Sequence, residues 1–298
     1  MTETPKIIAI IVTYHPELSH LKKLIAALLN QVDRILVVDN NTPNFNVRLL
    51  DEISEKLEII LNIENFGLAT AYNQACTIAK TQGYSHIILF DQDSLPAANM
   101  VIRLYSAMSN TNQHTFAAAA AGPKYEDIKG QKLPPFVRIK GFHLERIECS
   151  ENDVVDVDHL ISSGSLIDLR AIDYVGNFTD SLFIDCIDTE WCLRVRYNNL
   201  RLLGVGNAFM THNIGENYLN VLGRQLPSHT SPRLRYQFRN QVWIIKQSWV
   251  SWRWRIISSI RCAKLIGAYM VFAPNKANNL IAISKGIFDG LANKMGKI

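Results

Sequence analysis

The chain has 298 residues, of which 48% are hydrophobic and 19% are charged. This composition indicates a globular protein with a sizeable core and excludes a disordered chain. The net charge of +4 conceals an asymmetry, because residues 233–298 hold 12 Lys or Arg and a single acid, whereas residues 1–232 hold 19 basic and 26 acidic side chains. A basic tail on an acidic body predicts an anionic partner, such as a membrane surface, a nucleic acid or a phosphorylated lipid.

The first residues and the cysteines bear on the compartment. Residues 1–6 are polar, lead directly into an apolar run, and lack the pattern of a secretory signal, so we expect a cytoplasmic protein. The five cysteines form no CxxC pair and no metal-finger spacing, which indicates reduced thiols.

Strands and helices alternate in the first third of the chain. Apolar, β-branched runs predict buried strands at 7–12, 35–38, 57–61 and 87–90. Helical spacing of apolar residues predicts helices over 18–30 and 67–83. This order predicts parallel strands with helices on both faces, and such sheets bind ligands at the carboxyl ends of their strands.

The pattern changes after Met108. Gly, Pro and polar residues over 122–160 predict loops or an irregular hairpin. The remaining predicted elements are a strand at 160–169, a helix at 190–198, a strand at 200–205 and helices from Pro232 to near the end of the chain.

Two carboxylates flank one residue directly after a predicted strand, in Asp91-Gln92-Asp93. Carboxylate oxygens at this spacing suit Mg²⁺ or Mn²⁺, which would neutralise a diphosphate and make it a better leaving group. A solvated turn after a strand also favours Asp, so the motif by itself leaves both interpretations open.

Further polar residues lie at predicted helix and strand ends. Asn65 and Gly67 open a helix that carries Asn73 on its second turn, and a helix N-terminus offers N–H groups to a phosphate. Capping by Asn65 would explain that pattern without a ligand. Asp39 follows the second predicted strand, where it could accept a hydrogen bond from a nucleotide base or form a turn.

Together these motifs resemble family 2 glycosyltransferases. The matching segments are Thr13-Tyr14, Val38-Asp39-Asn40, Asn65-x-Gly67-x5-Asn73 and Asp91-x-Asp93. The form Asp91-Gln92-Asp93-Ser94-x-Pro96 is most similar to the bacterial dTDP-L-rhamnose-dependent rhamnosyltransferases. The resemblance implies an α/β fold of the GT-A type, a Rossmann-like mixed sheet flanked by helices, with a helical C-terminal appendage.

The resemblance also divides the chain. It implies a catalytic domain over 1–232, with a nucleotide-binding half at about 1–110 and an acceptor half at about 111–232. The basic, Trp-rich region 233–298 would follow it as a separate helical part.

Roles carried over from the family fall on residues in both halves. Those implied to bind the nucleotide sugar are Thr13, Tyr14, Asp39, Asn65, Gly67, Asn73, Asp91, Gln92, Arg233 and Arg239. Those implied on the acceptor and sugar side are Ser163, Gly164, Asp185 and Glu190. Asp91, Asp93 and His212 would hold Mg²⁺ or Mn²⁺.

The catalytic base is sought in Ile187-Asp188-Thr189-Glu190, which is similar to the family's acidic motif. Alignment on Arg194 makes Asp188 the base, a carboxylate that takes the proton of the acceptor hydroxyl. Ile187 stands where the family usually has Glu, so Asp185 remains an alternative. Acidic capping of a helix N-terminus would also explain these residues.

The implied activity is inverting, metal-dependent transfer of L-rhamnose from dTDP-L-rhamnose to a growing, lipid-linked cell-surface polysaccharide such as O-antigen. Another donor, such as UDP-galactofuranose, is the first alternative. A nucleotidyltransferase is disfavoured, because Thr13-Tyr14-His15-Pro16 lacks a Gly-rich phosphate loop.

The tail carries four of the five tryptophans, Trp243, Trp249, Trp252 and Trp254, interleaved with Lys and Arg. Aromatic and basic residues around apolar ones are typical of helices that lie in a membrane interface. We therefore expect peripheral binding to the inner face of the cell membrane, no nucleic acid partner and a possible homo-oligomer. A helical appendage packed on the catalytic domain and a nucleic-acid binder that stacks bases on these tryptophans are the alternatives.

Overall fold

The computed structural model describes residues 5–45, 50, 54–111, 118–127, 136–212, 217–221 and 224–298. Its main sheet runs in the order β3-β2-β1-β4-β10-β6-β11-β5, with β9 paired to β11. The strands are β1 (Ile7–Thr13), β2 (Arg34–Asp39), β3 (Leu57–Leu61), β4 (His86–Asp91), β5 (Ser94–Pro96), β6 (Ala118–Asp127), β9 (Val154–Val157), β10 (Leu166–Asp168) and β11 (Arg201–His212). β3, β2, β1 and β4 are parallel, whereas β10 is antiparallel to both of its neighbours, so the sheet is mixed as expected.

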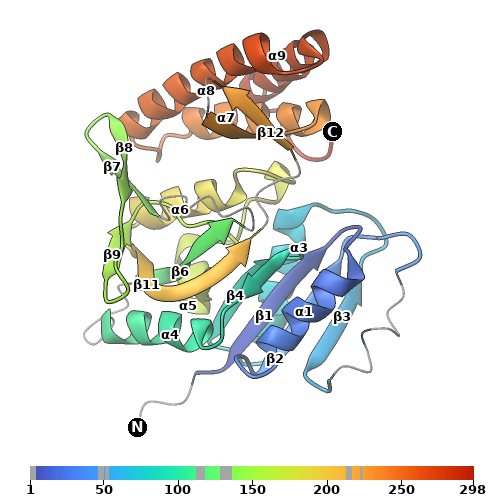
Figure 1. Cartoon of the computed structure of the whole chain (residues 1–298), viewed down its shortest axis with the longest axis vertical. Coiled ribbons are helices and arrows are strands. Elements are labelled where there is room, and N and C mark those ends of the chain that lie inside the picture. Colours follow the sequence, from blue (N-terminus) through green and yellow to red (C-terminus); the bar gives the residue numbers. More distant parts are fainter. Residues whose placement is uncertain are drawn as a thin grey trace.

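Helices cover both faces of this sheet (Figure 1). Ile7, Ala9 and Ile11 of β1 face a core shared with α1 (Leu18–Leu28) and α4 (Met100–Thr111). The alternate residues Ile8 and Ile10 face a second core with α3 (Leu68–Thr81), α5 (Leu169–Val175) and α6 (Ile187–Tyr197). Burial on both faces explains why the strands are continuous apolar runs.

The predicted elements of the first third are confirmed, and the prediction for 160–169 is wrong in extent. Only Leu166–Asp168 forms a strand there, because the chain turns first. Ser165 N–H donates to Ser162 O, and Gly164 has a φ of +79°. The region 122–160 does contain a hairpin, formed by β7 (Phe136–Lys140) and β8 (His143–Ile147).

Helices fill most of the C-terminal part. They are α7 (Ser231–Lys246), α8 (Trp252–Phe272) and α9 (Lys276–Leu291), and the hairpin β12 (Asn217–Val221) and β13 (Arg224–Ser228) precedes them. Figure 1 places α8 and α9 above α6 and the β7–β8 hairpin. Leu193 of α6 packs with Ile244, Val250 and Trp254, so the C-terminal helices share a core with the α/β part of the chain. The division at residue 232 stays a prediction.

α3 begins at a close approach between two distant segments. Gly67 has φ +87° and ψ 168°, a backbone conformation that is essentially restricted to glycine. Leu68 N–H donates to Phe183 O at 2.7 Å, just before α6. A Cβ on Gly67 would lie 2.6 Å from the Phe183 ring and 2.7 Å from its carbonyl oxygen. Gly67 therefore permits the close approach between the start of α3 and the segment before α6.

We predict that Gly67→Ala lowers the free energy of unfolding by about 3 kcal/mol, because it adds backbone strain and a clash with Phe183. Gly83→Ala is the matched control, since Gly83 also has a positive φ, +75°, but no atom within 4 Å of an added Cβ. The control should lose only about 1–2 kcal/mol. Urea unfolding of both variants measures the difference, and equal losses would contradict the close-approach argument.

Candidate active site

Three polar side chains lie at the carboxyl ends of neighbouring strands. Thr13 ends β1, Asp39 ends β2 and Asp91 ends β4. Thr13 pairs with Asp39 in register, and Val12 pairs with Asp91, so the three ends are level. The edge is therefore the place where an open α/β sheet binds its ligand.

The Asp39 carboxylate uses most of its acceptor positions in hydrogen bonds within the protein. Its Oδ1 accepts from Thr13 Oγ1 at 2.8 Å and from Thr42 Oγ1 at 2.7 Å, and its Oδ2 accepts from Thr42 N at 2.7 Å. The carboxylate is buried and uses three of its roughly four acceptor positions in this way. It can still accept one donor on Oδ2, so base recognition by Asp39 stays a prediction.

Gln92 joins the acidic loop to the loop after β1. Its Oε1 accepts from Tyr14 N at 2.9 Å, and its Nε2 donates to Tyr14 O at 3.3 Å. Tyr14 itself is 48% exposed, so its ring can meet a bound nucleotide. The two hydrogen bonds link the residue after Asp91 to the backbone of the loop after β1.

Arg233 of α7 lies among the carboxylates of the site. Its Nε and Nη2 donate to both oxygens of Asp185 at 3.0–3.2 Å. Burial acts to lower the pKa of Arg233, but the charges of Asp185, Asp91 and Asp93 together raise it. A cation facing three carboxylates is in position to pair with a diphosphate near the acidic loop.

Asn65 and Asn73 shape the site through the backbone. Asn65 Oδ1 accepts from Gly67 N at 2.9 Å, which fixes the turn into α3. Asn73 Nδ2 donates to Phe178 O and to Asp180 Oδ1, both at 2.8 Å, and its Oδ1 accepts from Phe178 N. The described contacts of Asn73 are thus with the chain rather than toward a donor pocket.

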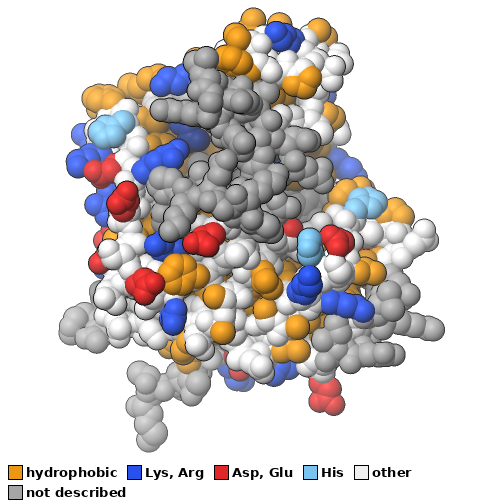
Figure 2. All heavy atoms as spheres, in the orientation of Figure 1, with side chains coloured by type: hydrophobic (Ala, Val, Ile, Leu, Met, Phe, Trp, Pro, Cys, Tyr) orange, Lys and Arg blue, Asp and Glu red, His pale blue; other side chains and the backbone are white. Residues whose placement is uncertain are grey.

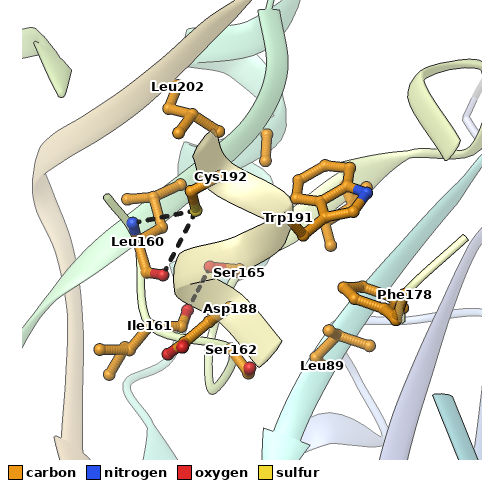
Figure 3. A pocket seen from close by; sticks show the side chains of 12 residues that line it. Leu89, Leu160, Ile161, Ser162, Ser165, Phe178, Asp188, Trp191, Cys192 and Leu202 are labelled. Atoms are coloured by element: carbon orange, nitrogen blue, oxygen red, sulfur yellow. Dashed lines mark hydrogen bonds between the residues drawn. The ribbon is translucent and has the colours of Figure 1, made fainter. Parts of the chain in front are cut away.

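Asp188 lies in the first turn of α6 and lines an apolar hollow (Figure 3). The side chain points toward Ile161 and Ser162, and Phe178 and Trp191 lie on the far side of the helix turn. Asp188 is 26% exposed, so an acceptor hydroxyl can reach it. By contrast, Asp185 is bound to Arg233, and the choice of Asp188 as the base stays a prediction.

The Asp188 carboxylate is kept ionised despite its apolar surroundings. Burial acts to raise its pKa, but His159 and the N–H groups of Thr189 and Ser162 outweigh burial and lower it. Thr189 N–H donates to Asp188 Oδ1 at 2.7 Å. At neutral pH the group is therefore an acceptor for a proton.

The charges of Asp91 and Asp188 both act on Tyr72. Its side chain is fully buried in α3, and burial followed by the charge of Asp91 raises its pKa well above the usual value. The charge of Asp188 acts on the same hydroxyl in the same direction. The buried phenol thus lies within the field of both carboxylates, although 97 residues of sequence separate Asp91 from Asp188.

A divalent metal fits the acidic loop in part. Asp91 and Asp93 supply hard oxygen ligands, and the backbone of His212 pairs with Ser94, next to Asp93. The side chain of His212 lies outside the described residues, so its part in a metal site stays a prediction. In the part of the chain that the structure describes, three or more His, Cys, Asp or Glu nowhere gather as a metal cluster.

Two residues expected at the ligand have structural contacts. Glu190 is buried and pairs with Arg194, with Nε–Oε1 at 2.6 Å and Nη2–Oε2 at 2.8 Å. The guanidinium of Arg239 is also buried and donates to the carbonyls of Leu182 and Gly296. These contacts hold both charges within the chain, and the acceptor role of Glu190 and the diphosphate role of Arg239 stay predictions.

Ser163 and Gly164 support the acidic loop by packing. Ser163 Oγ accepts from Asp91 N at 3.1 Å and lies 2.6 Å from Ser94 Oγ. Gly164 donates from its N–H to Leu89 O, and an added Cβ would lie 2.7 Å from Pro123. Both residues border the site, but a direct contact of either with a sugar stays a prediction.

Sequence reasoning missed three residues of the site. Tyr72 and His159 flank Asp188, and Asn240 fixes the segment before α6. Asn240 directly follows Arg239, and that neighbour was the signal that pointed to this part of the chain. His159 stands alone in sequence, and only the fold brings it to α6.

A parallel, Rossmann-like set of strands continued by a mixed set, with acidic residues at the carboxyl ends of the parallel strands, is the GT-A architecture. The chain belongs to glycosyl transferase family 2, whose model matches residues 9–161. It is 34% identical over 248 residues to the dTDP-rhamnosyl transferase RfbF of Shigella flexneri, covering 82% of this chain and 81% of that protein. The chain is thus a glycosyltransferase.

Solved structures show the same fold at low sequence identity. GalNAc-T7 with UDP, GalNAc and Mn²⁺ superposes with a TM-score of 0.60 at 14% identity. That match covers 81% of this chain but only 48% of GalNAc-T7. Residues 1–349 of S. aureus TarS in complex with UDP give a TM-score of 0.55 at 11% identity, covering 96% of this chain and 72% of that one.

Proposed function

We propose that this glycosyltransferase transfers L-rhamnose from dTDP-L-rhamnose, with inversion, to a saccharide acceptor carried on a lipid. The observation that carries the proposal is that Thr13, Asp39 and Asp91 stand level at the carboxyl ends of neighbouring strands. The similarity to a dTDP-rhamnosyl transferase over 82% of the chain supports the choice of donor.

The reaction is a single displacement. Asp188 takes the proton of the acceptor hydroxyl while the acceptor oxygen bonds to the anomeric carbon of the sugar. The bond from that carbon to the diphosphate breaks, and its electron pair leaves with the nucleoside diphosphate. Attack opposite the leaving group inverts the anomeric configuration.

Other residues hold the donor. Asp39 and Thr13 lie where the nucleoside would bind, and Tyr14 offers an exposed ring beside them. Arg233 would exchange part of its pairing with Asp185 for diphosphate oxygens. A Mg²⁺ or Mn²⁺ ion bound by Asp91 and Asp93, with His212 as a further ligand, would supply charge neutralisation of the leaving diphosphate.

We predict that Asp93→Ala and Asp188→Asn each lower the rate of donor turnover by about 100-fold or more. The first variant loses a metal and diphosphate contact, and the second loses the base. The measurement is dTDP release from dTDP-L-rhamnose with Mn²⁺ or Mg²⁺, before and after EDTA. Asp173→Ala, which removes an exposed pair with Lys80, is the control and should stay active. Full activity of both site variants, or indifference to EDTA, would reject these roles.

The donor is tested separately by thermal shift. We expect dTDP-L-rhamnose and dTDP to raise the melting temperature with Mn²⁺ present, because a ligand bound only to the folded state stabilises it. Asp39→Asn should weaken this shift if the carboxylate contacts the base. A larger shift with UDP or UDP-galactofuranose than with the dTDP compounds would replace rhamnose by the alternative donor.

The tryptophans of the C-terminal helices mostly pack in the protein core. Within the described residues, no helix combines the length and the apolar character needed to cross a bilayer. Trp254 is buried, and Trp243 and Trp249 pack beside it, so three of the four tail tryptophans serve the core as the packed-appendage alternative expects. Trp252 remains 57% exposed.

Apolar side chains are nevertheless exposed on α8 and α9 beside basic ones (Figure 2). The exposed apolar residues there include Trp252, Ile256, Ile260, Met270, Val271, Ile281, Phe288 and Leu291. The exposed basic residues include Arg253, Arg261, Lys264, Lys276 and Lys285. This mixture suits an anionic lipid surface, and peripheral membrane binding is part of the proposal.

We predict that the protein sediments with phosphatidylglycerol vesicles at low salt and far less with phosphatidylcholine vesicles. Phe288→Ser together with Leu291→Ser should weaken the binding about tenfold, because two exposed apolar side chains are lost. Ile63→Ser is the control, since Ile63 is 88% exposed but belongs to the catalytic half. Equal loss in the control, or preferential binding of oligonucleotides, would contradict a lipid surface as partner.

A further inference from the structure

His159 lies on a loop that two elements hold in place. The loop follows β9, and His159 forms an isolated antiparallel bridge with Val137 of β7. The neighbouring Asp158 accepts Ile139 N at 2.7 Å and pairs with Arg196 Nε of α6 at 2.8 Å. The backbone of His159 is therefore fixed relative to both the β7–β8 hairpin and α6.

The imidazole of His159 faces the first turn of α6. Its Nε2 lies 3.1 Å from Thr189 Oγ1 and 3.8 Å from Asp188 Oδ2. The second distance suits an ion pair but is too long for a hydrogen bond. Thr189 closes the triangle, because its N–H donates to Asp188 Oδ1 at 2.7 Å and its Oγ1 donates to the same oxygen at 3.4 Å.

Asp188 needs such a partner. It must be ionised before the reaction, yet it lines a hollow formed mainly by apolar side chains, among them Leu89, Phe178 and Trp191. A carboxylate in apolar surroundings tends to take up a proton unless a donor or a cation opposes this. The N–H of Thr189 donates to Oδ1 of Asp188, and the His159 side chain faces Oδ2 of Asp188.

We propose that His159 is a positioning residue for the catalytic base, and that its Nε2 holds Asp188 and Thr189 so that the carboxylate stays ionised in one orientation. The inference rests on the proposed role of Asp188. His159 does not touch the reacting atoms in this account. It acts through Asp188, and its side chain is 30% exposed.

Other titratable groups around Asp188 come from three elements and bear on any pH profile. They are Tyr72 of α3, Tyr125 of β6, and Cys186 and Cys192 at α6, and the Asp188 charge raises the pKa of each. All four are neutral at pH 7, because burial raises the pKa of each of them first. Among the titratable side chains near Asp188, His159 is the one that lowers the pKa of Asp188 and so favours the ionised carboxylate.

The test is the pH dependence of dTDP release from dTDP-L-rhamnose by the full-length protein. His159→Ala should lower kcat by about tenfold or more, and should move the acid limb of the profile up by about one pH unit, because the pKa of Asp188 rises when its partner is lost. His159→Gln places an N–H donor near the position of Nε2 and should restore part of kcat. His143→Ala on the exposed end of β8 is the matched control and should leave the profile unchanged.

The outcomes separate this inference from the proposed function. A wild-type rate and acid limb in His159→Ala would overturn the positioning role. Equal losses in the Ala and Gln variants, with a lower melting temperature and an unmoved acid limb, would show a purely structural residue and also overturn it. If Asp188→Asn is fully active, the base assignment itself fails, and that result does not depend on the His159 variants.

Discussion

The position of α6 depends on hydrogen bonds from α7 to the segment just before α6. Asn240 Nδ2 donates to the carbonyls of Leu182, Ile184 and Asp185, and Arg239 reaches Leu182 as well. Phe183, Asp185 and Cys186 in this segment all have positive φ, a conformation that non-glycine residues adopt only when the surroundings enforce it. Both α7 side chains are fully buried. Helix α7 thus holds Asp185 against Arg233. It also sets the position of the first turn of α6, which contains Asp188.

Charge balance explains how so many carboxylates share one edge of the sheet. Asp39 is stabilised by three hydrogen bonds, Asp185 by Arg233, and Asp188 by His159 with Thr189. Each of these acids has its own donors within the protein, and these donors offset the repulsion between neighbouring carboxylates. The acidic loop, with Asp91 and Asp93, also lies within the field of Arg233. A nucleotide sugar bearing a diphosphate therefore meets a site with one cation in place and, we propose, a metal ion as the second.

The basic tail serves two purposes in this fold. Its inner faces complete the catalytic part, through the core of Leu193, Ile244, Val250 and Trp254. Its outer faces carry exposed apolar and basic residues on α8 and α9. The centroid of the Phe142 ring, at the tip of the β7–β8 hairpin, lies 5.2 Å from the centroid of the Trp252 ring. This contact links the hairpin to the start of α8. A lipid surface bound by these helices would consequently lie near the side of the molecule that carries the hairpin and the loop of His159.

The sequence by itself determined the first half of the sheet, because strands buried on both faces must be continuous apolar runs and their ends carry Thr13, Asp39 and Asp91. It also determined the family, since several motifs occur in the right order. Only the tertiary structure decided which charges pair within the chain: Glu190 pairs with Arg194, and Arg239 donates to the carbonyl of Leu182. The pairing of His159 with Asp188 is of the same kind. Contacts between residues far apart in the chain depend on how loops pack, and local patterns carry no record of that packing.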